Sequence, residues 1–247
     1  MEPDVRPVGS DSPVFPNTRW SLVLQAGANA DEQARSALAH LCREYWYPLY
    51  AYVRRRGFGA EDAQDLTQSF MLEIIAGPLL SRADPEVGRF RSFVLGAMQN
   101  FLANAKRHQK TQRRGGEFTF IPIDGARDEG RYGLEPLDQF TAEDAFERNW
   151  ALALLDTVLL RLREEFAAAG RAALFSALQP YLAGKEGQAG YAAVGRELGL
   201  SENTVAVSVH RQRRRYGELL REEIAMTVAT PEEIESEIAH LMAVLSR

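Results

Sequence analysis

The sequence YAAVGRELGLSENTVAVSVHRQRRR, residues 191–215, has the pattern of two short helices joined by a tight turn. Gly199 lies where the chain must turn with a positive φ, which glycine adopts at little cost. Ser201 can cap the second helix by accepting bonds from backbone N–H groups. Val205 and Val209 are four residues apart, so they share the face that packs the second helix onto its domain. The stretch therefore predicts a helix-turn-helix.

The face of the second helix opposite these valines is polar, and it continues into a basic run. In a recognition helix the N-terminal end points at base edges, and later arginines meet phosphates. An ordinary helical hairpin is the competing interpretation. The small Gly195 at the crossing, the glycine turn, the cap and the basic continuation together favour DNA binding. The candidate contacts are Ser201, Glu202, Asn203, Thr204, Ser208, Arg211, Arg214 and Arg215.

Earlier in the chain, GAEDAQDLTQSFMLEII, residues 59–75, predicts a helix with an apolar stripe and an acidic face. Asp62 and Asp65 are three residues apart and lie together, opposite the stripe. Gln68 or Ser69 continues that face. Carboxylates near a helix N-terminus also suit the helix dipole, so a solvated face remains the competing interpretation to a partner-binding one.

The next helical segment, FRSFVLGAMQNFLANAKRHQK, residues 90–110, mixes phenylalanines with amides and bases. Aromatic rings that stack on bases, beside cations that follow the backbone, are typical of single-stranded DNA binding. For Phe93 and Phe101 the hydrophobic core is the favoured place. Asn100, Asn104 and Arg107 share one helix face and are the better contact candidates.

Composition and residue spacing argue against a membrane protein, a secreted protein and an enzyme. The 247 residues carry a net charge of −5, but bases cluster at residues 106–114 and 211–215, with an acidic stretch between them. There is no long apolar run and no signal peptide, so we expect a cytoplasmic protein with no membrane insertion. The histidines (His40, His108, His210 and His240) are scattered and no carboxylate group has catalytic spacing. We therefore expect no enzyme activity, no catalytic residue, no metal site and no cofactor.

The pattern predicts an all-α fold with two small helical domains, the second containing the helix-turn-helix. Residues 1–17 are expected to form a disordered tail, and residues 18–110 the first domain. Residues 111–143 are rich in glycine and mixed charge and are expected to form a flexible acidic linker. The second domain covers 144–228, and an amphipathic helical extension covers 229–247.

Taken together, these motifs resemble bacterial sigma factors of the sigma-70 superfamily, in the extracytoplasmic-function (ECF) group. The resemblance covers about Arg19 to Val228, with the three motifs in the family's order. Residues 50–74 look like the segment that binds core RNA polymerase, and residues 90–107 look like the segment that melts and recognises the minus-ten element. Residues 191–228 look like the domain that recognises the minus-35 element. A helix-turn-helix regulator that never engages polymerase is the alternative, but it leaves the two earlier helices unexplained.

The resemblance implies partners for each motif. Asp62, Asp65, Gln68 and Ser69 would bind polymerase, whose β′ and β subunits are the expected protein partners. The linker would lie along the active-site and RNA-exit region. The loop at 81–89 would hold a flipped base of promoter DNA. The minus-ten contacts would come from Arg89, Arg91, Asn100, Asn104, Lys106, Arg107 and Lys110.

Three features depart from the family pattern. Asn104 stands where the family usually has Asp, and Gly195 replaces a common Ala. The tail and the helix after Thr230 are additions. That last helix carries an apolar stripe beside several glutamates, so it is expected either to regulate the protein in cis by covering a binding surface or to stabilise the second domain. An anti-sigma factor is the other expected form of control.

Overall fold

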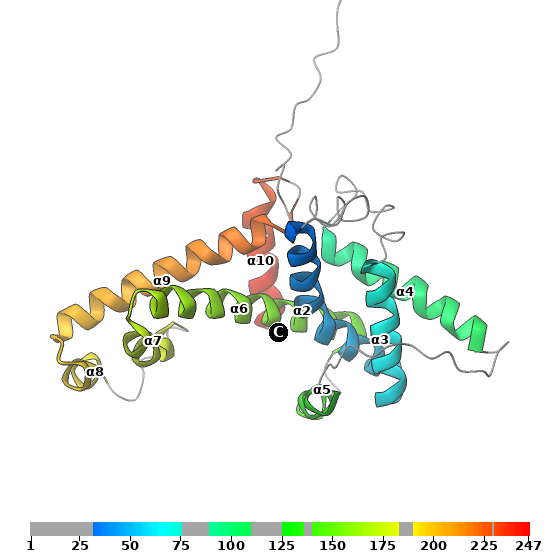
Figure 1. Ribbon diagram of the computed structural model, residues 1–247, viewed down its shortest axis with the longest axis horizontal. Coiled ribbons are helices and arrows are strands. Elements are labelled where there is room, and N and C mark those ends of the chain that lie inside the picture. Colours follow the sequence, from blue (N-terminus) through cyan, green and yellow to red (C-terminus); the bar gives the residue numbers. More distant parts are fainter. Residues whose placement is uncertain (1–31, 76–88, 110–124, 136–139, 183–189, 229) are drawn as a thin grey trace, which may run out of the picture.

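The computed structural model (Figure 1) describes residues 32–75, 89–109, 125–135, 140–182, 190–228 and 230–247. All regular secondary structure within these ranges is helical, which confirms the all-α class for this part of the chain. The α-helices are α2 (Glu32–Arg55), α3 (Ala60–Ile75), α4 (Phe90–Gln109), α5 (Gly125–Tyr132), α6 (Ala142–Ala168), α7 (Ala172–Leu178), α8 (Tyr191–Leu198), α9 (Glu202–Ala225) and α10 (Glu233–Leu245), and η2 (Gln179–Tyr181) is a 3₁₀ turn.

Some expectations lie outside the described residues. They are the disordered tail at 1–17, the base-holding loop at 81–88, the contact residue Lys110 and the part of the linker at 111–124.

Helix α6 organises the fold. It begins with a capping box, in which the Thr141 hydroxyl accepts from the Asp144 backbone N–H and the Asp144 carboxylate accepts from the Thr141 N–H. Its 27 residues give it a length of about 40 Å. A buried stripe at steps of four follows, made of Phe146, Trp150, Leu154, Val158 and Leu162. Helix α6 packs against α2, and also against α7, α9 and α10.

The two expected domains share one hydrophobic core. The main cluster joins Tyr45 and Leu49 of α2 with Trp150 of α6, Ile224 of α9 and Leu241 of α10. The structure differs here from the expectation of two domains separated by a linker. The physical reason is the length of the α6 stripe, which offers apolar surface to both halves at once. A second, smaller cluster lies under α8 and the start of α9.

Residues 125–135 differ from the flexible linker that the sequence predicts, because they include α5 and are held against α2. The Trp46 indole donates to Asp128 over 2.8 Å. The Arg54 guanidinium donates to both carboxylate oxygens of Glu129, over 3.0 and 2.7 Å. Such two-pronged pairing fixes geometry as well as adding attraction. These hydrogen bonds lower the pKa of Glu129 below its usual value. The acidity of this segment therefore serves its attachment to α2.

Candidate functional site

The turn between α8 and α9 depends on two glycines, Gly195 within α8 and Gly199 at its end. Gly199 ends α8 in the left-handed region, with φ of 66°. At Gly195 a Cβ atom would lie 2.6 Å from the Leu200 carbonyl oxygen, a separation that real Cβ atoms do not show. The Leu200 N–H donates to the Gly195 carbonyl over 2.7 Å, which closes the turn. Because of this close approach, a residue with a Cβ atom does not fit at Gly195 without a shift of the turn.

Helix α9 begins as the sequence predicts. The Ser201 hydroxyl caps it by accepting from the Thr204 backbone N–H over 3.2 Å. Val205 and Val209 are buried with Leu178 and the other residues of the smaller cluster. The apolar face of α9 is therefore turned inward over its first two turns, and the polar face is left toward solvent.

The predicted contacts at the start of α9 are accessible. Arg211 is exposed. Ser208 is half-buried, and its hydroxyl donates to the Thr204 carbonyl over 2.7 Å. The exposed residues at the helix start are Ser201, Glu202, Asn203 and Thr204. Since a helix N-terminus carries partial positive charge and N–H groups, this end of α9 is suited to an anionic ligand.

The end of the basic run is paired with carboxylates of the protein itself. Arg215, expected to contact DNA, pairs with Glu165 at 2.7 Å and with Glu218 and Glu222 at 3.2 Å each. The hydrogen bond that the Arg215 guanidinium donates to Glu165 lowers the pKa of that carboxyl group. Arg214 is 77% exposed and pairs with Glu218 on its own helix. In the free protein Arg215 therefore joins α6 to α9, and its contact with DNA stays a prediction.

The acidic face of α3 is open to solvent. Asp62 and Asp65 are exposed, whereas Gln68 and Ser69 are half-buried. The opposite face is buried by Ala63, Thr67, Phe70, Met71 and Ile74. The structure thus places the two aspartates together on the outer surface. Gln68 and Ser69 are less accessible to a partner than the aspartates are.

Helix α4 divides its residues as the sequence predicts. Phe93 and Phe101 pack against the core, and the ring of Phe101 lies 5.6 Å from that of Phe70. Asn100 and Asn104 are exposed. Lys106 and Arg107 belong to α4, but their side chains lie outside the described part of the chain.

Arg91 is predicted as a DNA contact, and in the free protein it is buried against other helices. Only 4% of its side chain is exposed, and it lies 4.8 Å from the centre of the Trp150 ring. It pairs with Glu147 over 2.7 Å and with the buried Glu237 of α10. Arg89 is half-buried and pairs with the other oxygen of Glu237 over 2.8 Å. Two of the expected minus-ten contacts are therefore held by the C-terminal helix.

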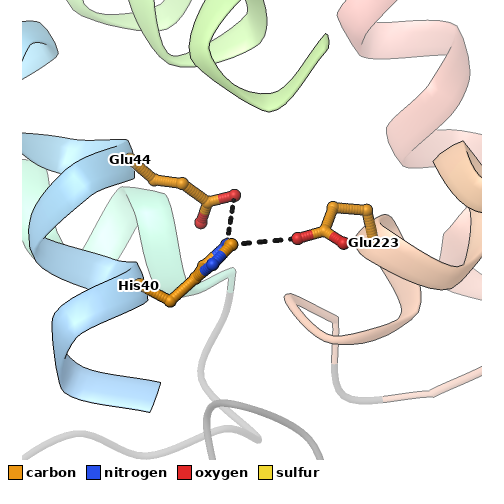
Figure 2. A group of neighbouring side chains, drawn as sticks. All are labelled: His40, Glu44 and Glu223. Atoms are coloured by element: carbon orange, nitrogen blue, oxygen red, sulfur yellow. Dashed lines mark ion pairs between the residues drawn. The ribbon is translucent and has the colours of Figure 1, made fainter. Parts of the chain in front are cut away.

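The sequence did not predict one cluster of three polar side chains (Figure 2). His40 and Glu44 lie one turn apart on α2, and Glu223 approaches them from α9. The His40 Nε2 atom lies 3.0 Å from a Glu44 oxygen and 3.2 Å from a Glu223 oxygen. The i, i+4 spacing of His40 and Glu44 is visible in the sequence. Glu223 belongs to a different part of the chain, and only the packing of α9 near α2 brings it there.

Within the described residues, no helix combines the length and the apolar character needed to cross a membrane. Comparison of the chain with protein-family models, curated proteins and solved structures found no match.

Proposed function

We propose that the protein is an RNA polymerase sigma factor, which binds core polymerase, directs it to promoters and helps to open the duplex. The observation that carries the proposal is the α8–α9 unit. It combines a left-handed glycine turn, a serine cap and a polar helix start that faces solvent. In this proposal the unit is a helix-turn-helix that reads the major groove of the minus-35 element.

The other two motifs are assigned by the same proposal. The exposed Asp62 and Asp65 of α3 bind the polymerase β′ subunit. The exposed Asn100 and Asn104 of α4 meet minus-ten DNA. Amides and carboxylates held on rigid helices, with their apolar faces buried, support roles in recognition. No catalytic step is assigned to the chain, and its place of action is the cytoplasm, where polymerase acts.

Helix α10 acts in cis within this proposal. Glu237 engages Arg89 and Arg91, so the free protein holds these two bases away from DNA. The helix contacts the C-terminal half of α9 through the Arg221–Glu235 pair at 3.1 Å, and it lies far from α8 in Figure 1. The minus-ten side is therefore the regulated one, and the start of α9 stays open. A helix that only stabilises the core is the simpler alternative, since Leu241 and Val244 are buried.

The test is reconstituted transcription. Purified chain is added to bacterial core polymerase on a library of promoter fragments from the source genome. The proposal expects specific start sites that depend on the added chain. Substitution of Asn203 by Ala should change transcription from those sites, with no loss of polymerase binding. Binding to duplex DNA in the absence of any effect on polymerase would instead identify a stand-alone helix-turn-helix regulator.

A further inference from the structure

We propose that His40, Glu44 and Glu223 form a binding site for a divalent transition-metal ion of the zinc type. The proposal does not rest on the function proposed above. One imidazole nitrogen and two carboxylates converge from two helices, and their ligand atoms all lie within 4.8 Å of one another. One nitrogen with two carboxylate oxygens is a donor set that zinc accepts.

The distances suit a metal ion. Ligand bonds to zinc are about 2.0–2.2 Å, so the ligand atoms of a tetrahedral ion lie about 3.3 Å apart. The observed separations from the His40 nitrogen are 3.0 Å to Glu44 and 3.2 Å to Glu223. The oxygens of Glu44 and Glu223 lie within 4.8 Å of each other, so a small shift of the side chains would place all three ligand atoms around an ion.

Burial adds a reason for a cation. Glu44 is 4% exposed and Glu223 is fully buried, whereas His40 keeps 20% of its side chain exposed. Two carboxylates this close in a water-poor setting repel one another. A divalent ion bound by both removes that repulsion, and the neutral imidazole completes the set.

The surroundings orient the ligands and leave a way in. The Arg161 guanidinium donates to the second Glu223 oxygen over 2.8 Å, which turns the first oxygen toward His40. Such outer contacts fix the direction of a metal ligand. Arg161 also pairs with Glu222 at 2.7 Å, so its charge is shared between two carboxylates. A cavity of about 450 Å³, lined in part by His40 and Glu223, gives access for the ion and room for a water at the open position.

The ion would tie α2 to α9, so its binding has a measurable consequence for stability. The full chain, without a histidine tag, is stripped with a chelator and titrated with Zn²⁺ by calorimetry. We expect one ion per chain. At a free concentration about a hundred times Kd, the melting temperature should rise by roughly 5–10 °C. Titration with Co²⁺ should give visible absorption bands of a low-coordinate site.

Variants assign the ion to this site. His40→Ala and Glu44→Gln should each lower Zn²⁺ affinity by more than about tenfold. Glu44→Gln keeps the shape of the side chain, and circular dichroism checks that both variants fold. His210→Ala is the matched control, since His210 is an exposed histidine on α9, and its affinity should not change. Lack of stoichiometric Zn²⁺ binding, or binding that survives both ligand substitutions, would overturn the proposal and leave a histidine–carboxylate ion pair.

Discussion

Two arginine-bearing regions of this molecule look alike in the sequence and differ in the structure. At the start of α9 the polar side chains and Arg211 face solvent, over a small local core. At the start of α4 Arg91 is 4% exposed, between Glu147 and Glu237. The difference lies in the neighbours. Helix α10 supplies a buried carboxylate to α4, whereas it lies far from the start of α9, whose neighbours are α7 and α8. A basic residue is thus available to DNA in the free protein only where the fold leaves it exposed.

The largest effect is expected from removing the buried arginine. Arg91→Ala removes the cation that Glu147 and Glu237 share. Glu237 then keeps Arg89, and Glu147 keeps His240, as the remaining partner. Removing one partner of a buried ion pair costs about 3–5 kcal/mol in the free energy of unfolding. The measurement is urea denaturation followed by circular dichroism. Arg211→Ala, on the exposed side of the comparison, should change that free energy by no more than about 0.5 kcal/mol. Equal effects of the two substitutions would show that Arg91 is not buried.

A second substitution tests the turn that exposes α9. In Gly195→Ala the new Cβ would meet the Leu200 carbonyl at 2.6 Å, so the turn must open. Overpacking of this kind costs about 1–3 kcal/mol, and affinity for duplex DNA should fall with it. Gly96→Ala in α4 is the matched control, because nothing lies within 4 Å of its new Cβ. That variant should be unchanged or more stable by about 0.5–1 kcal/mol. A stable Gly195→Ala protein with normal DNA binding would remove the explanation given for the glycine.

A third comparison concerns two arginines on α9 itself. Arg211 is exposed, whereas Arg215 is paired with three glutamates. Each phosphate contact contributes about 0.9 to the slope of log affinity against log salt concentration. Arg211→Ala should therefore reduce that slope by about 0.9 in fluorescence anisotropy with duplex DNA, and Arg215→Ala should leave it unchanged. The reverse result would restore Arg215 as a DNA contact.

The smallest effect is a pH dependence of the α6–α9 junction. The Arg215 guanidinium lowers the pKa of Glu165 from its ordinary value of 4.5. A lowered pKa in the folded state means that the stabilisation is present above pH 4.5 and is lost as pH falls through the lowered pKa. Since Glu165 is 40% exposed, solvent screening limits the contribution to less than about 1 kcal/mol. In urea denaturation, Glu165→Gln should be less stable than the wild type at pH 7, and the difference should shrink below pH 4.5. A difference that is the same at pH 7 and pH 3 would contradict the pairing.

Local pattern predicted much of this molecule. The all-α class, the turn at Gly199, the cap at Ser201 and the inward Val205 and Val209 all follow from spacing and residue type. Each depends on residues within one or two turns of one another. The aspartates of α3 were placed correctly on an outer face for the same reason.

Long-range pairing was beyond the sequence pattern. Arg91 pairs with Glu147 and Glu237, Arg215 with Glu165, and His40 with Glu223. These partners lie on helices distant in the chain, so spacing carries no signal of them. The prediction of a flexible linker does not hold for residues 125–135, because hydrogen bonds from Trp46 and Arg54 attach this segment to α2. An acidic, glycine-containing stretch has the composition of a linker even when hydrogen-bond donors elsewhere in the chain hold it in place.

The central claim is tested most directly by measuring, with gel filtration, whether the protein binds bacterial core RNA polymerase. The account predicts that the wild type co-elutes with polymerase. Asp62→Ala/Asp65→Ala should bind about tenfold more weakly or worse if, as proposed, both carboxylates belong to the polymerase contact. Glu164→Ala/Glu197→Ala, which removes two exposed acids from other helices, should bind like the wild type. A wild type that does not co-elute, with or without residues 230–247, would contradict the sigma-factor account.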